Sequence, residues 1–153
     1  MIRFTSEQYR ACCDSPAWVA GMIGAQPFAD AEAMYLAADE IWLGAGPDDW
    51  RAAFAAHPNI GAKRTSGFSA AEQAGVADAT AQTLAAIAAC NVAYHDRFGF
   101  VFLICATGKS ADEMLSALRS RLDNDVETEL HNAAEEHRKI TRLRLARLIE
   151  APQ

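Results

Sequence analysis

A histidine that follows an amphipathic stretch is the first residue in this sequence that could do chemistry. In WRAAFAAHPNIG, a helical period of about 100° per residue places Trp50, Phe54 and His57 on one face. Pro58 disfavours a helical conformation at His57, and Gly61 permits a tight turn. An imidazole fixed at a helix end suits general acid–base catalysis, because proton transfer demands fixed geometry. The alternative is a histidine that only interacts with the last helix carbonyls and the helix dipole.

An arginine in the last expected helix is the second candidate. Arg144 falls in the middle of an otherwise apolar stripe, whereas Arg138 and Arg142 point the other way. Because arginine is almost never fully buried unless paired, Arg144 either meets a protein carboxylate or faces a pocket that holds an anion. A stem that extends outward to solvent is a further alternative. The stripe consists of Val126, Leu130, Ala133, His137, Ile140 and Leu148, and its histidine is most simply a packed, hydrogen-bonded residue.

A polar segment, SAAEQ, supplies the third set of candidates. Ser69 and Glu72 have the spacing of a capping box, which explains both without any function. Gln73 adds a second polar group, and a helix start presents free N–H groups that can bind polar substrate atoms. The segment therefore predicts either a helix cap or a binding element.

The elements that must position these residues are predicted to be helices, because alanine is abundant and β-branched residues are scarce. The least polar part, Phe98–Gly108, could be a strand or a helix, and the lack of a second strand candidate favours a turn at Gly99 and a buried helix. We expect one all-α domain over 1–153, a bundle of about seven to nine helices. Helix starts are expected at Thr5 or Ser6, Ser15-Pro16, Asp30, Asp48 or Asp49, Thr80, Ser110–Glu113 and Asn124-Asp125.

Composition excludes several classes of function. The net charge of −6 and the absence of a basic run argue against a nucleic-acid partner. No apolar stretch approaches the roughly 20 residues of a membrane-spanning helix, and the N-terminus lacks the apolar region of a signal peptide. The four cysteines lack CxxC spacing, so reduced thiols in a cytoplasmic protein are expected. The spacing of the histidines and cysteines does not match that of metal ligands, so no metal site is expected.

Several blocks, in their order and spacing, are together specific enough to suggest a family. They are SPAWV at Ser15, AFAAHPNIG at Ala53, SAAEQ at Ser69, NVAYHDRFGFVFLICATG at Asn91, RSRLDND at Arg119 and KITRLRLARL at Lys139. With them the chain resembles the OHCU decarboxylase family, whose members convert 2-oxo-4-hydroxy-4-carboxy-5-ureidoimidazoline (OHCU) to (S)-allantoin in urate breakdown. The resemblance implies an all-α fold, no cofactor, a homodimer and a small anionic ureidoimidazoline as substrate.

The resemblance also implies site residues. His57 looks like the proton-transferring histidine, with Pro58 beside it, and Arg144 looks like the pocket arginine. Ser69 to Gln73 looks like the polar binding segment, with Glu72 as its functional carboxylate. The main-chain segment that binds substrate looks like Phe102, Leu103, Ile104, Cys105 and Ala106.

A mechanism follows as a hypothesis. The substrate ring carries a conjugated imine next to the carboxylated carbon, so it supplies its own electron sink. The protein would orient the scissile carboxylate, stabilise the spreading charge and deliver one proton to one face. His57 would transfer the proton, Glu72 would hold the ureido or hydroxyl groups, and Arg144 would supply positive charge. The alternatives are a cofactor-free hydrolase or lyase that acts on another small ureide, and a non-enzymatic helical interaction domain.

Overall fold

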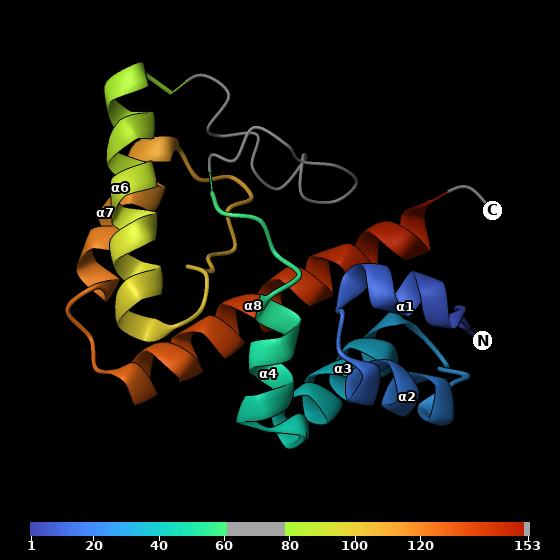
Figure 1. Cartoon of the computed structure of the whole chain (residues 1–153). Helices are drawn as coiled ribbons and strands as arrows, with labels where there is room; N and C mark the ends of the chain where they lie inside the picture. The colour runs from blue at the N-terminus through green and yellow to red at the C-terminus, as the bar shows by residue number, and fades with distance from the viewer. Residues whose placement is uncertain (61–78, 152–153) are drawn as a thin grey trace. The chain divides into compact units, whose positions relative to one another are not determined.

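The computed structural model describes residues 1–60 and 79–151, and the regular elements in these residues are helices. The all-α expectation is confirmed, because the β-pairing in the described residues is limited to an isolated antiparallel bridge between Ile2 and Phe28. Figure 1 shows the helices α1 (Ser6–Cys12), α2 (Pro16–Ala25), α3 (Ala31–Ala45), α4 (Pro47–Phe54), α6 (Ala81–Phe98), α7 (Ala111–Arg121) and α8 (Val126–Glu150).

The chain divides into two compact units. The first comprises Met1–Ala56 and Arg138–Gln153, and the second comprises His57–His137, so that α8 contributes residues to both. The expectation of a single domain over 1–153 stays a prediction. Within the described residues, no helix is both long enough and apolar enough to cross a membrane.

Side-chain caps begin the first three helices where the sequence predicts them. Thr5 forms a capping box with Gln8, the Ser15 hydroxyl accepts from the N–H of Trp18, and Asp30 accepts from the N–H of Ala33. These bonds satisfy N–H groups that have no partner inside their own helix.

The start of α4 differs from the expectation that Asp48 or Asp49 caps it. The N-cap residue is Gly46, which has φ 92° and makes no side-chain cap, and both aspartates lie in the first turn. Pro47 occupies the first helical position, where its fixed φ is already suitable and its missing N–H leaves no donor unpaired. The acidic residues still favour this end of the helix, because its dipole is positive there.

Aromatic side chains form the core of the first unit. Tyr9, Trp18 and Trp42 are at most 2% exposed, and the Tyr9 and Trp18 rings meet edge to face with centroids 5.8 Å apart. The buried indole N–H groups are paired, because Trp18 donates to the Ala38 carbonyl at 3.1 Å and Trp50 to the Trp42 carbonyl at 2.8 Å. Each bond spares a buried donor the penalty of remaining unsatisfied.

Helices α2 and α3 pack closely in this unit, at a point where α2 has no side chain. A Cβ atom at Gly21 would lie 2.7 Å from Cγ2 of Ile41, closer than real Cβ atoms approach other atoms. Glycine at position 21 therefore permits this approach of the two helices.

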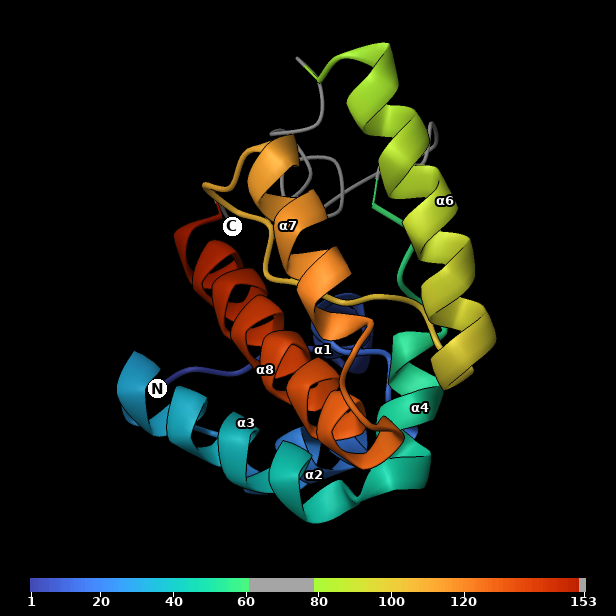
Figure 2. The same ribbon diagram turned by 90° about the vertical axis from the view of Figure 1, so that its left-hand side faces the viewer.

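In the second unit, α6 and α7 lie side by side (Figures 1 and 2). Thr80 caps α6 through the N–H of Thr83, and Gly99 ends it in a left-handed conformation with φ 80°, so the expected turn at Gly99 is confirmed. Ser110 and Glu113 form the predicted capping box of α7. The Asp125 carboxylate accepts from the N–H of Thr128 at 2.7 Å at the start of α8.

Two expectations, one about a helix and one about a buried face, are wrong. Residues 101–106 form neither a helix nor a strand, although Phe102, Leu103, Ile104 and Ala106 are all buried as expected. Val126, which was expected to face inward on α8, is 47% exposed because it lies at the first position of that helix. The irregular backbone at 101–106 means that its polar groups need partners from elsewhere.

Candidate active site

His57 lies in a bend that follows α4. The regular helix ends at Phe54, and one further turn is closed by a bond from the N–H of Ala56 to the Ala53 carbonyl at 3.2 Å. The helix therefore ends earlier than the Trp50–Phe54–His57 spacing predicts, because the residues before Pro58 leave the helical ladder. His57 and Pro58 are both half-buried.

The ring of His137 packs against His57. The two ring centroids are 4.8 Å apart, with an interplanar angle of 79°, which is an edge-to-face arrangement. His137 is fully buried on α8. The sequence favours a packed role for His137, and the packing partner proves to be the candidate catalytic histidine itself. This contact restricts the plane that the His57 imidazole can adopt.

A second contact fixes the chain just after His57. Asn91 on α6 is 6% exposed, and its Nδ2 donates to the Ile60 carbonyl at 3.1 Å. The bond ties the end of the short segment 57–60 to a regular helix. Catalytic groups benefit from such anchoring, because their geometry must be set before the reaction starts.

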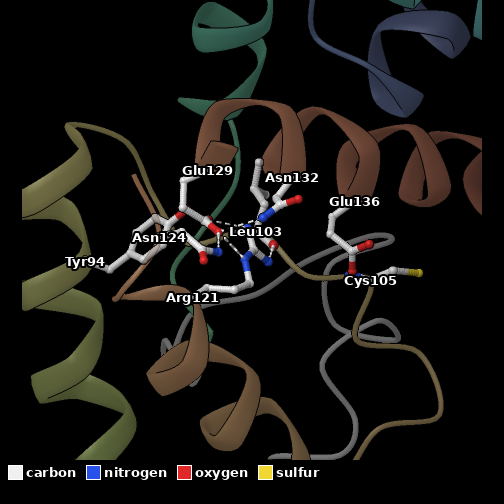
Figure 3. Close-up of polar contacts among 8 residues, drawn as sticks. All are labelled: Tyr94, Leu103, Cys105, Arg121, Asn124, Glu129, Asn132 and Glu136. Carbon is white, nitrogen blue, oxygen red and sulfur yellow. Dashed lines mark hydrogen bonds and ion pairs between the residues drawn. The ribbon is translucent and has the colours of Figure 1, made fainter. Parts of the chain in front are cut away.

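The segment Phe102–Ala106 is held by side chains as well as by its own burial. Nη1 of Arg121 donates to the Leu103 carbonyl at 2.6 Å, and Oε1 of Glu136 accepts from the Cys105 N–H at 3.1 Å (Figure 3). The Ala106 carbonyl accepts from the N–H of Lys109 at 2.9 Å. These bonds replace the ladder that a helix or strand would provide, which explains how a buried segment can remain irregular.

Arg121 belongs to a buried polar cluster centred on Glu129, which we call the Glu129 cluster. The Glu129 side chain is fully buried and accepts from Nε and Nη2 of Arg121 at 2.8–3.1 Å. Nδ2 of Asn124 and Nδ2 of Asn132 each donate to Oε1 at 2.9 Å, and the Tyr94 hydroxyl donates to Oε2 (Figure 3). The Arg121 guanidinium also lies over the Phe102 ring, 4.5 Å from its centroid.

The cluster shifts two pKa values in opposite directions. Burial acts to raise the pKa of Glu129, but the hydrogen bonds from Arg121, Asn132, Tyr94 and Asn124 outweigh it and hold that pKa below its usual value. Burial raises the pKa of Tyr94, and its hydrogen bond to Glu129 adds to the effect. Glu129 is therefore a carboxylate and Tyr94 a neutral phenol at neutral pH.

Arg144 is 8% exposed in the first unit, which agrees with its place on the apolar stripe of α8. Its Nη1 atom lies 3.4 Å from the Ala11 carbonyl oxygen and 3.5 Å from that of Cys12. These carbonyls end α1, where the helix dipole is negative, so they are favourable neighbours for a guanidinium. The sequence suggests either a protein carboxylate or a bound anion as the partner of Arg144. The structure shows main-chain carbonyls as partners, which the sequence did not suggest.

Ser69, Glu72 and Gln73 lie outside the described residues. Pro58, His57 and the Phe102–Ala106 segment belong to the second unit and Arg144 to the first. Among the residues that are described, no group of three or more His, Cys, Asp or Glu side chains could hold a metal ion.

Sequence reasoning gave no role to Arg121, Glu129 or Glu136. A carboxylate on a helix usually lies on the solvated face, yet Glu129 is fully buried. The available signal was the clustering of Arg121, Asn124 and Glu129 around the α7–α8 connection, inside and just after the RSRLDND block.

The chain matches known proteins over nearly its whole length. A family model described as OHCU decarboxylase matches residues 4–146. A solved structure, that of an OHCU decarboxylase in the presence of (S)-allantoin, is 36% identical, with a TM-score of 0.87 over 97% of this chain and 100% of that one. A structure of (S)-allantoin synthase, 19% identical with a TM-score of 0.69, covers 92% of this chain and 48% of that chain and supports the fold alone.

Curated relatives agree. The uric acid degradation bifunctional protein TTL of Arabidopsis thaliana is 38% identical over 151 residues, which are 93% of this chain and 46% of that protein. The 2-oxo-4-hydroxy-4-carboxy-5-ureidoimidazoline decarboxylase of Amia calva is 44% identical over 62 residues, which are 40% of this chain and 35% of that protein. The chain thus spans less than half the length of these curated relatives. The family match and the fold together lead to one conclusion: the chain belongs to the OHCU decarboxylase family.

Proposed function

We propose that this chain catalyses the cofactor-independent decarboxylation of OHCU to (S)-allantoin in urate breakdown. The observation that carries the proposal is the similarity, over 97% of this chain and 100% of that chain, to a decarboxylase structure in the presence of (S)-allantoin. The enzyme would be a carboxy-lyase in purine catabolism.

The chemistry of this substrate decides what the protein has to provide. The imine conjugated with the carboxylated carbon accepts the electron pair as carbon dioxide leaves. The protein therefore has three tasks. It holds the carboxylate perpendicular to the ring before carbon dioxide leaves, stabilises the charge that spreads into the ring, and delivers a proton to one face. Delivery to a single face makes (S)-allantoin the only enantiomer formed.

His57 carries the proton in this proposal. The imidazole is half-buried, and the His137 ring and the Asn91–Ile60 bond support its position. General acid–base catalysis of this kind needs the histidine within hydrogen-bond distance of the reacting atom.

The other candidates bind and orient the substrate. Arg144 supplies positive charge to the anion, and Glu72 holds the ureido or hydroxyl groups. Ser69, Gln73 and Pro58 complete the polar contacts around the ring. The main chain of Phe102, Leu103, Ile104, Cys105 and Ala106 binds ring N–H and carbonyl groups, and the apolar side chains of this segment keep water away.

The assembly and location also belong to this proposal. We infer a homodimer in the cytoplasm, with 1–153 as a single OHCU decarboxylase-like domain. The four cysteines without CxxC spacing support a reducing compartment.

The test mixes the purified protein with freshly generated OHCU and follows the circular dichroism of (S)-allantoin as it forms. Wild-type protein should form (S)-allantoin faster than the spontaneous reaction does. His57→Gln should lose about 10²–10⁴-fold of the rate while keeping its melting temperature, because it lacks only the proton-transferring group.

Two results would contradict the proposal. A wild-type rate equal to the spontaneous rate would remove OHCU as the substrate, and turnover of a different small ureide would favour the hydrolase or lyase alternative. A folded His57→Gln variant with a near wild-type rate would remove His57 from the mechanism.

A further inference from the structure

We propose that Arg121 and Glu136 are positioning residues that set the main-chain conformation of Leu103–Cys105 for substrate binding. The inference rests on the proposed function, because it assigns these two side chains a role in shaping the main-chain part of the same site. Neither residue touches substrate in this proposal, and both act through the backbone that does.

The hydrogen bonds made by Arg121 and Glu136 lie on either side of one residue, and one binds a main-chain acceptor while the other binds a main-chain donor. Arg121 donates to the carbonyl of Leu103, and Glu136 accepts from the N–H of Cys105. Between them lies Ile104, which is 8% exposed and whose main-chain N–H and carbonyl make no hydrogen bond within residues 1–60 and 79–151. A buried amide with no partner is destabilising, so this donor and acceptor suit a ligand with matching groups. A ureido or ring amide offers both.

The Arg121 guanidinium is held in place by contacts other than its bond to the Leu103 carbonyl. Nε and Nη2 bind the buried Glu129 carboxylate, which leaves Nη1 of the same rigid plane directed at the carbonyl oxygen. The guanidinium also lies over the Phe102 ring, so the residue before Leu103 is fixed at the same time. Displacing Nη1 would require a shift of the whole Glu129 cluster.

Glu136 fixes the other side of Ile104 through its hydrogen bond to the main chain. Its side chain is half-buried on α8, and its Oε1 atom accepts from Cys105 at 3.1 Å. A glutamine at this position offers a similar acceptor oxygen without the charge, whereas alanine offers none. This difference separates a positioning role from a direct electrostatic one.

The experiment compares four variants with wild-type protein in the OHCU assay. Arg121→Lys keeps the charge but not the planar fork that binds Glu129 and Leu103 together. Arg142→Lys is the matched control, because Arg142 also lies over a ring, that of Tyr35 at 4.6 Å, and also pairs with a carboxylate. Glu136→Ala and Glu136→Gln test the second bond. Each protein is measured for kcat, KM, melting temperature and amide hydrogen exchange of the 102–106 peptide.

We expect Arg121→Lys and Glu136→Ala to lower kcat/KM by roughly 10- to 100-fold, since small displacements of a binding group have effects of this order. Both should speed exchange in the 102–106 peptide at temperatures where the protein stays folded. Glu136→Gln should recover most of the loss seen in Glu136→Ala, and Arg142→Lys should keep the wild-type kcat/KM.

The failures can be told apart. A wild-type protein without OHCU turnover would overturn the proposed function and the positioning role with it. With an active wild type, an Arg121→Lys variant that melts earlier but keeps kcat/KM would overturn the role of Arg121. A Glu136→Gln variant as impaired as Glu136→Ala would overturn positioning through the Cys105 bond and assign the effect to the charge. If Arg121→Lys does not fold, the two Glu136 variants decide.

Discussion

Arg121 and Arg142 make the same kinds of contact, but their carboxylate partners differ in exposure to solvent. Each guanidinium lies over an aromatic ring, 4.5 Å from the centroid of Phe102 for Arg121 and 4.6 Å from that of Tyr35 for Arg142. The carboxylate that pairs with Arg121 is fully buried, whereas the Glu32 carboxylate that pairs with Arg142 is 63% exposed. The same chemical pair is therefore internal in the second unit and superficial in the first.

The backbone around each arginine explains the difference. Arg142 and its partners lie on α3 and α8, regular helices whose main-chain groups are already bonded within the helix. Arg121 lies beside 101–106, a buried segment without a regular ladder, where a carbonyl needs a donor from a side chain. Burial of two charges by itself brings little net stability. The buried pair of Arg121 and Glu129 has a further effect, because it provides a hydrogen-bond donor to a main-chain carbonyl that lacks a regular partner.

The largest effect should come from removing the centre of the Glu129 cluster. Glu129→Ala leaves the Arg121 charge and three further donors without their acceptor, and we expect it to lower the free energy of unfolding by about 3–5 kcal/mol. Urea denaturation at neutral pH measures the change. The comparison of the two arginines would fail if the loss were below 1 kcal/mol, the scale of an exposed pair.

A comparable loss in the first unit should require removal of an apolar side chain instead. Met34 on α3 is fully buried, and Met34→Ala should lower the free energy of unfolding by about 2–5 kcal/mol through lost burial and the cavity left behind. The same urea experiment applies. A negligible loss would mean that this core collapses around the deletion and that apolar packing is not what holds the first unit.

Acid should act on the Glu129 cluster. The folded pKa of Glu129 lies below its ordinary value of 4.5, because the hydrogen bonds it accepts outweigh burial. Its contribution to stability is therefore present above pH 4.5 and is lost as the pH falls through the folded pKa. Urea midpoints measured from pH 7 downward should fall more steeply for wild type than for Glu129→Gln. Parallel curves would show that Glu129 does not titrate differently in the folded state.

The sequence predicted those parts of the fold that depend on local interactions. Thr5, Ser15, Asp30, Thr80 and Ser110 cap helices as expected, because a cap joins residues only three positions apart. The helix expected over the 101–106 stretch was wrong for the opposite reason. Its partners Arg121 and Glu136 are separated from Leu103 and Cys105 by 18 and 31 residues, and hydrophobic periodicity carries no information about such bonds.

The candidate site divides in the same way. His57 and Arg144 were selected from helix geometry; Arg144 is buried on α8 as that geometry predicts, whereas His57 is half-buried in a bend beyond the end of α4. The packing of His137 on His57 joins residues far apart in the chain, so its significance could not be seen in the sequence. The catalytic and binding roles of these residues, and those of Ser69, Glu72 and Gln73, stay predictions.

The smallest effect should come from the surface pairs of the first unit. Asp39 accepts from Arg138 at 3.2 Å and pairs with Arg142 at 3.6 Å, and its side chain is 21% exposed. Asp39→Ala removes both pairs. Both arginine side chains are partly exposed, so water can hydrate their charges when Asp39 is absent. We therefore expect a loss of at most about 1 kcal/mol.

Salt provides the control for this prediction. Exposed pairs are screened at high ionic strength, so the difference between wild type and Asp39→Ala should shrink in about 1 M sodium chloride. The loss in Glu129→Ala should change much less, because its unpaired groups lie inside the protein, where screening is weak. If Asp39→Ala matched Glu129→Ala in size and in resistance to salt, burial would not be what distinguishes the two arginine networks.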